Sequence, residues 1–113
     1  MLLAVHYSYM QMKTFSDWVV ELARSVPAGR VTTYGDLARA AGAGPMAAQS
    51  ITSILSKAYD AGVRDIPFHR IVYAGGRIWV NETHRKERMK LYKQEGIEID
   101  ARDRVVGFEE IRI

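Results

Sequence analysis

Apolar residues recur every three or four positions between residues 13 and 26, which is the spacing of one face of an α-helix. Thr14 or Ser16 can cap this helix, and Pro27 ends it because proline does not continue a helix. Residues 30–32 follow as a short extended segment. The apolar stripe consists of Phe15, Trp18, Val19, Leu22 and Val26. The pattern therefore predicts an amphipathic helix followed by a small strand.

Two further helices follow with only three residues between them. Thr33 precedes Asp36 by three positions, an arrangement like a capping box, which predicts a helix over residues 33–41. Residues 42–44 turn the chain, and Pro45 suits the first position of a helix that continues to residue 59. Its inner face consists of Ala47, Ala48, Ile51, Ile54, Leu55 and Ala58. Two short helices joined by such a glycine turn form a helix-turn-helix.

The opposite face of this third helix is polar and slim. It consists of Gln49, Ser50, Ser53, Ser56 and Lys57. A helix with small polar side chains fits a DNA groove, whose width is about 6–12 Å. An ordinary solvent-exposed face has the same composition, so both interpretations stay open on this pattern alone.

Short β-rich runs follow the third helix. Residues 71–73 and 77–80 flank Gly75 and Gly76, which predicts a hairpin. A hairpin after a helix-turn-helix is a wing. The expected fold class is therefore α+β and mainly helical, with a winged helix-turn-helix.

The last third of the chain begins with a charged helix. Residues 82–95 have helical character, with Met89 and Tyr92 on the apolar side, and Gly96 ends the helix. The basic side chains of this helix are Arg85, Lys86, Arg88, Lys90 and Lys93. Small strands are expected at residues 105–106 and 111–113, around Gly107.

Charge is distributed unevenly along the sequence. Residues 77–93 carry six Lys/Arg against two Asp/Glu, whereas residues 94–113 carry three against six. The net charge is +3. A basic patch attracts a polyanion such as DNA, although a solvated helix face is at least as common an explanation.

The 113 residues contain no cysteine, which excludes disulfides, thiolate metal sites and cysteine nucleophiles. Residues 1–12 lack a signal-peptide pattern and are too short to span a bilayer. They are expected to be an N-terminal extension or edge strand, with residues 13–113 as a single domain. The expected location is the cytoplasm, with no membrane association.

The segment from Ile66 to Val72 has the composition of a site. Pro67 fixes its own backbone angle, so the side chains of Phe68, His69 and Arg70 leave the backbone in a set direction. The simpler interpretation is the start of a strand, with a buried Phe68 and a structural His69.

Several motifs together resemble the DNA-binding domain of the O6-alkylguanine-DNA alkyltransferases. They are the run Val26-Pro27-Ala28-Gly29-Arg30-Val31-Thr32-Thr33-Tyr34-Gly35-Asp36-Leu37-Ala38, then Ala47-Ala48, Pro67-Phe68-His69-Arg70-Ile71-Val72 and Glu95-Gly96. The resemblance is strongest to the alkyltransferase-like proteins, which lack the reactive cysteine, because Phe68 stands at the cysteine position.

The resemblance implies a role for each matching residue. His69 and Glu95 fall on the pair that would activate the cysteine, so here they would be a relic relay and no residue would be catalytic. The implied DNA-binding residues are Thr33, Tyr34, Gln49, Ser50, Ser53, Arg70 and Arg77, and the implied lesion pocket consists of Tyr34, Pro67, Phe68, Val80 and Asn81. Tyr34 falls on the tyrosine that helps rotate a nucleotide out of the duplex. The helix over residues 45–59 would lie in the minor groove.

Two departures from the family pattern concern the DNA contact and the pocket. Gln49 stands where the family has the arginine that replaces the flipped base, and glutamine is shorter and uncharged. The loop that walls the alkyl pocket aligns with residues 80–84, which contain no glycine.

These observations predict a DNA-binding protein that is not an enzyme. By resemblance it would recognise alkylated guanine in double-stranded DNA as a monomer, need neither cofactor nor metal, and mark lesions for nucleotide excision repair proteins. The candidates for phosphate contacts are Arg39, Lys57, Arg77 and Arg85. An enzyme would need another nucleophile, with Tyr73 and His69 the nearest. A winged-helix regulator or partner-binding module with a vestigial site is the other alternative.

Overall fold

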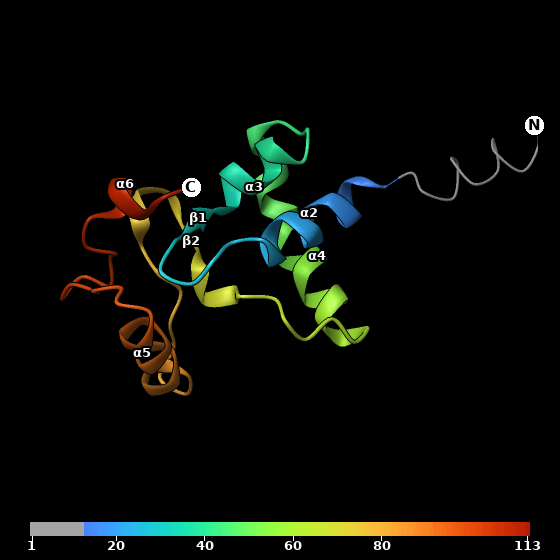
Figure 1. Ribbon diagram of the computed structural model, residues 1–113. Coiled ribbons are helices and arrows are strands. Elements are labelled where there is room, and N and C mark those ends of the chain that lie inside the picture. Colours follow the sequence, from blue (N-terminus) through green and yellow to red (C-terminus); the bar gives the residue numbers. More distant parts are fainter. Residues whose placement is uncertain (1–12) are drawn as a thin grey trace, which may run out of the picture.

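The structure, a computed structural model, describes residues 13–113 (Figure 1). The expectation of an edge strand or extension for residues 1–12 lies outside this range. The helices are α2 (Phe15–Arg24), α3 (Tyr34–Ala40), α4 (Ala48–Asp60), α5 (Arg85–Gln94) and α6 (Phe108–Ile111), and the strands are β1 (Thr32–Thr33) and β2 (Ile71–Val72). Short 3-10 turns cover Pro45–Ala47, Phe68–Arg70 and Ala74–Gly76. The predicted fold class, mainly helical with a small β component, is confirmed.

The helix starts follow the capping residues of the sequence. The hydroxyl of Thr14 accepts a hydrogen bond from the amide of Asp17 at 3.1 Å, and the Asp17 carboxylate accepts one from the Thr14 amide at 3.0 Å. Thr33 caps α3 in the same way through the amide of Asp36, at 3.0 Å. Both pairs satisfy amides that would otherwise lack a partner at the helix start.

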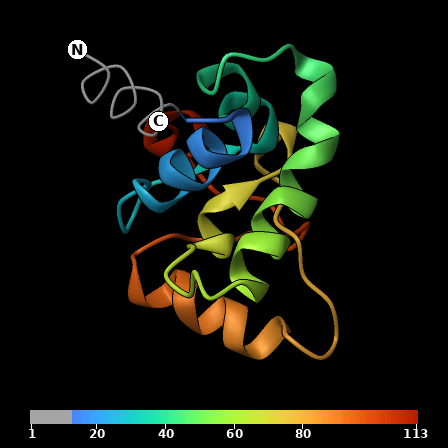
Figure 2. The ribbon, with the colours of Figure 1, turned by 90° about the vertical axis from the view of Figure 1, so that its right-hand side faces the viewer.

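Helices α2, α3 and α4 pack around one hydrophobic core (Figures 1 and 2). Its buried members are Val19, Ala23, Leu37, Ala38, Ile51, Leu55, Ile66 and Ile71. Ile51 and Leu55 confirm the predicted inner face of the third helix. Trp18 belongs to the apolar stripe of α2 but is 45% exposed, because the stripe is wider than the contact with α3 and α4.

The predicted hairpin is wrong. β2 pairs in parallel with β1, with Thr32 opposite Ile71 and Thr33 opposite Val72. Only the start of the turn behaves as expected, because the Tyr73 amide donates to the Arg77 carbonyl at 2.8 Å.

The backbone beyond Arg77 pairs with the C-terminal segment instead of with β2. The Ile78 amide donates to the carbonyl of Asp103 at 2.8 Å, and Arg77 forms an antiparallel bridge with Arg104. Local sequence favours extended backbone at residues 77–80 but does not specify its hydrogen-bond partner.

The C-terminal segment closes a second core on the other side of the sheet. Its buried members are Val31, Val72, Ile78, Tyr92, Ile97 and Val105. Ile71 lies in the first core and Val72 in the second, since successive strand residues point to opposite faces. The small sheet therefore joins the helix-turn-helix to α5 and the C-terminal segment.

Three further predictions differ in detail. The predicted strand at residues 111–113 forms only an isolated parallel bridge between Arg112 and Val31, because Ile111 is the last residue of α6. The Val31 amide donates to the Ile111 carbonyl at 3.1 Å, and the Ile113 amide donates to the Val31 carbonyl at 2.9 Å. Val105 forms an isolated bridge with Ile99 rather than a strand. The basic helix begins at Arg85 and not at residue 82.

No helix within residues 13–113 has both the length and the apolar character needed to cross a membrane.

Candidate functional site

Phe68 lies at the centre of the site, at the start of the 3-10 turn between the helix-turn-helix and β2. Pro67 before it is buried, and the Arg70 amide donates to the Pro67 carbonyl at 2.9 Å, which closes the turn. The ring of Phe68 is half-buried and meets the ring of Tyr59 edge to face at 5.9 Å. The fixed turn therefore holds the phenyl ring beside α4.

One side of Phe68 faces a pocket of about 250 Å³, here called the aromatic pocket. It is lined by Tyr34, Thr52, Ser56, Phe68, Tyr73, Trp79 and Arg88. The rings of Tyr34 and Tyr73 lie 5.5 Å apart and fix one wall. Burial and the neighbouring Tyr73 raise the pKa of Tyr34, so its hydroxyl stays protonated at neutral pH. The pocket thus offers aromatic faces, hydroxyls and one guanidinium.

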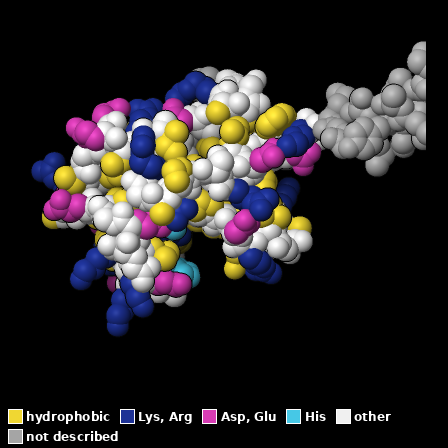
Figure 3. Space-filling model, viewed as in Figure 1, with side chains coloured by type: hydrophobic (Ala, Val, Ile, Leu, Met, Phe, Trp, Pro, Cys, Tyr) yellow, Lys and Arg dark blue, Asp and Glu magenta, His cyan; other side chains and the backbone are white. Residues whose placement is uncertain are grey.

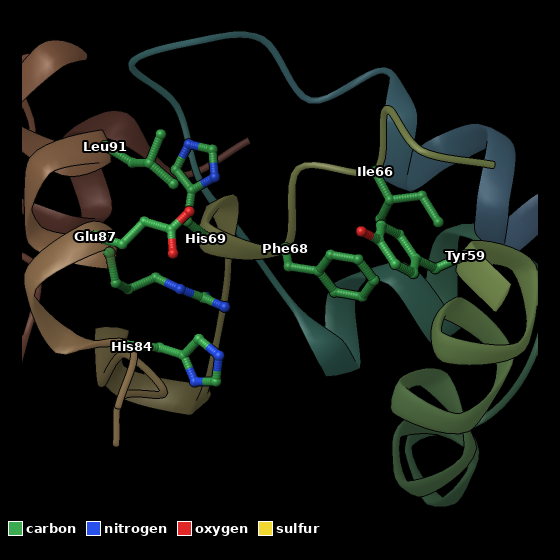
Figure 4. A pocket seen from close by; sticks show the side chains of 8 residues that line it. Tyr59, Ile66, Phe68, His69, His84, Glu87 and Leu91 are labelled. Carbon is green, nitrogen blue, oxygen red and sulfur yellow. The ribbon is translucent and has the colours of Figure 1, made fainter. Parts of the chain in front are cut away.

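The other side of Phe68 faces a pocket of about 380 Å³, here called the histidine pocket (Figure 4). It is lined by Tyr59, Ile66, Phe68, His69, His84, Glu87, Arg88 and Leu91. In Figure 4, Phe68 lies between the α4 side, with Tyr59, and the α5 side, with Glu87 and Leu91. Figure 3 shows the same hollow as a notch with histidine at its edge. Phe68 therefore lines both pockets.

The side chains of His69, Arg70 and Glu95 form a hydrogen-bond network next to Phe68. Nε2 of His69 donates to the Glu95 carboxylate at 2.6 Å, and the Arg70 guanidinium donates to it through Nε at 2.9 Å and NH2 at 2.8 Å. The Gly29 amide adds a further hydrogen bond at 3.1 Å, and Arg70 also donates to the carbonyl of Val26 at 2.9 Å. Every one of these donors is directed at a group inside the protein.

The network fixes the protonation states of its members. Burial raises the pKa of Glu95, but the hydrogen bonds from Arg70, His69 and Gly29 outweigh it and lower that pKa to about 2. Burial lowers the pKa of His69 more than the Glu95 carboxylate raises it, so His69 is neutral at pH 7. The pair has the arrangement of a base and its orienting carboxylate, yet the residue it would serve is a phenyl ring without a proton to give.

The predicted DNA-binding residues separate into two groups. Gln49, Ser50 and Ser53 are exposed together on α4, and Arg77 is exposed with its guanidinium 5.1 Å from the ring of Tyr73. Thr33 is buried and occupied as the cap of α3, while Arg70 is held by Glu95. The first group and Tyr34 are open to a ligand, whereas Thr33 and Arg70 support the structure around them.

The predicted lesion-pocket residues are only partly brought together. Tyr34 and Phe68 line the aromatic pocket, but Val80 lines a neighbouring pocket beside Arg77. Pro67 is buried below Phe68, and the Asn81 side chain accepts a hydrogen bond from the His84 amide at 2.8 Å. Sequence reasoning missed Tyr73, Trp79 and Arg88. The signal available in the sequence was the presence of one aromatic residue, Tyr73 or Trp79, in each of the two β-rich runs that precede the basic helix.

The phosphate-contact candidates also differ in availability. Arg39 pairs with Asp36, and Arg85 donates to Asp103 through two nitrogens at 3.0 and 2.8 Å. Lys57 is exposed at the end of α4. Lys and Arg side chains are spread over the face in Figure 3 among acidic ones, and several extend from the lower end, where α5 lies.

The described part of the chain contains no group of three His, Asp or Glu side chains that could hold a metal ion. His69 and Arg70, which follow Phe68, both donate hydrogen bonds to Glu95.

Comparisons with known proteins confirm the resemblance. The DNA base-flipping protein of Escherichia coli strain K12 is 28% identical over 88 residues, which are 78% of this chain and 66% of that protein. A bifunctional methyltransferase/endonuclease of Thermoplasma volcanium is 34% identical over 99 residues, or 85% of this chain and 29% of that protein. This chain therefore spans just under two thirds of the base-flipping relative.

Two solved structures share the fold. Atl1 of S. pombe in complex with damaged DNA containing O6-carboxymethylguanine matches with a TM-score of 0.61 and 25% identity, over 79% of this chain and 83% of that one. A second structure, S. pombe ATL in complex with DNA, matches with a TM-score of 0.66 and 22% identity, over 90% and 98% of the two chains.

The family model of the 6-O-methylguanine DNA methyltransferase DNA-binding domain matches residues 14–97. The match extends from the cap of α2 to the residue after Gly96, and so includes Tyr34, α4, Phe68 and Glu95. The chain belongs to the family of this DNA-binding domain, with a phenylalanine where the family resemblance places the reactive cysteine.

Proposed function

We propose that this protein binds double-stranded DNA, takes an alkylated guanine of the O6-alkylguanine type out of the duplex, and holds it without transferring the alkyl group. The observation that carries the proposal is Phe68 as the wall of an aromatic pocket beside the exposed polar face of α4. A base extruded from the stack needs apolar and aromatic surface to replace its neighbours, and this pocket supplies it.

The relatives support this function. One is named a DNA base-flipping protein, and another solved relative is bound to DNA containing O6-carboxymethylguanine. Alkyl transfer needs a nucleophile, and the chain has no cysteine. The Glu95–His69 pair has no acceptor to activate at Phe68, so the protein acts by binding.

The proposal extends to the surroundings of the site. Tyr34, Gln49, Ser50, Ser53 and Arg77 contact the DNA, and Thr33 and Arg70 hold the supporting structure. The domain of residues 13–113 acts as a monomer in the cytoplasm, and the bound lesion is handed to nucleotide excision repair proteins.

The test is a titration of matched duplexes with and without O6-methylguanine at fixed salt. Preferential binding of the damaged duplex is expected. Affinity for both duplexes should fall with salt, with a slope of about −0.9 for each phosphate contact in a plot of log K against log salt concentration. An affinity that does not change with salt concentration would contradict a DNA-binding role.

A regulator with a vestigial site is the second candidate. The observation in its favour is that Phe68 packs on Tyr59 and the first core as an ordinary apolar side chain would. This candidate predicts equal affinity for damaged and undamaged duplexes and a preference among DNA sequences, so the same titration separates the two.

A further inference from the structure

Arg88 is a charged side chain of α5 that lies where the two pockets meet. It lines both the aromatic pocket and the histidine pocket, and it is only partly exposed. Arg70, Arg85 and Arg112 each pair with a carboxylate. By contrast, none of the ion pairs formed within residues 13–113 includes Arg88. A half-buried guanidinium without a carboxylate partner retains donors for a ligand.

Trp79 holds this guanidinium in place. The central carbon of the Arg88 guanidinium lies 5.3 Å from the centre of the Trp79 ring, which is a cation–π contact. Trp79 also lines the aromatic pocket and is 39% exposed. The contact therefore orients the guanidinium along a wall of that pocket.

The remaining lining groups show what kind of ligand suits this donor. Arg88 is the one charged residue among the side chains that line the aromatic pocket, together with four aromatic rings and the hydroxyls of Thr52 and Ser56. A guanidinium is a planar fork of donors that matches two adjacent acceptors. On a purine, guanine presents N7 and O6 as such a pair, whereas adenine presents N7 beside an amino donor.

We propose that Arg88 reads the N7/O6 edge of the flipped guanine in the aromatic pocket, and that Trp79 is the positioning residue for its guanidinium. The inference rests on the proposed function and adds a specificity-determining residue to it. It assigns the pocket to guanine-type bases and against adenine-type bases.

The test uses three duplexes that are identical except at one position, which holds guanine, O6-methylguanine or 7-deaza-O6-methylguanine. Replacement of N7 by a C–H group removes one hydrogen-bond acceptor and keeps the size of the base and its alkyl group. For the unsubstituted protein, the deaza duplex is expected to bind about ten-fold more weakly than the O6-methylguanine duplex. Arg88→Gln should reduce this ratio to about one.

Matched variants separate charge, geometry and position. Lys90→Gln removes the same charge from an exposed position of the same helix and should leave the ratio unchanged. Arg88→Lys keeps the charge without the planar fork and should recover only part of the ratio. Trp79→Ala should reduce the ratio of affinities for the O6-methylguanine and deaza duplexes, and Trp79→Phe should retain most of it. Thermal unfolding checks that each variant is folded.

The outcomes distinguish this inference from the proposed function. A protein that prefers O6-methylguanine but is indifferent to N7, or an Arg88→Gln variant that keeps the full ratio, overturns the role of Arg88 and leaves the proposed function standing. Equal loss on all three duplexes makes Arg88 a phosphate contact and also overturns it. No preference for O6-methylguanine over guanine in the unsubstituted protein rejects the proposed function itself.

Discussion

Nε2 of His69 lies 2.6 Å from the carboxylate of Glu95, and the same carboxylate accepts hydrogen bonds from Arg70 and from the Gly29 amide. Glu95 follows α5, His69 lies in the turn before β2, and Gly29 lies in the loop after α2. The carboxylate thus joins three segments that are distant in sequence. In a chain without a nucleophile at position 68, this geometry serves to hold the turn that carries Phe68.

Glu95→Gln is expected to lower the free energy of unfolding by about 2–3 kcal/mol, because Arg70 would keep a partly buried charge without its partner. Urea denaturation at neutral pH measures this. Glu98→Gln is the control, because Glu98 is exposed and lies three residues away. Equal effects of the two substitutions would contradict the role of Glu95 as a junction.

Acid should destabilise the protein in two stages. The lowered pKa of His69 means that the unfolded chain, with a pKa near 6.5, binds a proton more readily than the native one. The contribution of neutral His69 to the free energy of unfolding is complete at neutral pH and is lost as the pH falls below about 6.5. The pKa of Glu95 drops on folding from 4.5 to about 2, so its contribution is present above pH 4.5 and is lost between about 4.5 and 2.

The measurement for this prediction is the free energy of unfolding as a function of pH. His69→Gln should remove the first stage and keep the second. A first stage that persists unchanged in that variant would assign it to another group.

Phe68→Ala tests the pocket wall. Loss of the ring should weaken binding of O6-methylguanine duplexes by about 1–3 kcal/mol, the range for stacking of one base on an aromatic side chain. Binding of plain duplex should change much less, and thermal unfolding checks that the domain stays folded. An equal loss on both duplexes would make Phe68 only a packing residue.

Phe68→Cys introduces a thiol at the position next to His69. His69 and Glu95 already have the geometry of a base and its orienting carboxylate. We therefore expect the cysteine to accept the methyl group from an O6-methylguanine duplex, which is detected as an increase in protein mass. The serine variant at the same position is the control and should gain no mass.

Gln49→Arg tests the face of α4. Gln49 is exposed beside Ser50 and Ser53, and an arginine there adds a charge and a longer side chain to the proposed DNA contact. Tighter binding of damaged duplex by about 1 kcal/mol is expected, with unchanged unfolding. Weaker or unchanged binding would mean that α4 meets DNA in another orientation.

Gly76→Ala tests the turn that the hairpin prediction misjudged. Gly76 has φ +89°, and a Cβ added there would lie 2.9 Å from the ring of Phe108. The expected loss is about 2–4 kcal/mol, from backbone strain and displacement of α6. Gly75→Ala is the control, because Gly75 has φ +81° but open space around it, and should cost about 1 kcal/mol.

Local signals in the sequence determined the helices and their caps. Thr14 and Thr33 accept the amide hydrogen bonds that their spacing to an acidic residue predicted, and Ile51 and Leu55 are buried as the helical period required. These features depend on residues within one or two turns, so sequence spacing is sufficient to find them. The motif around Phe68 likewise placed the family and the centre of the site.

Only the tertiary structure decided how the β segments pair and which side chains share the pocket. The sequence around Ile71 and Val72 does not indicate that they pair with β1 and not with residues 77–80. Strand pairing depends on which segment the tertiary fold places beside them. Trp79 and Arg88 come from different segments, and only the tertiary structure brings the guanidinium within 5.3 Å of the ring. The sequence therefore determined the helices and the identity of the central residue, whereas long-range packing decided the wall around it.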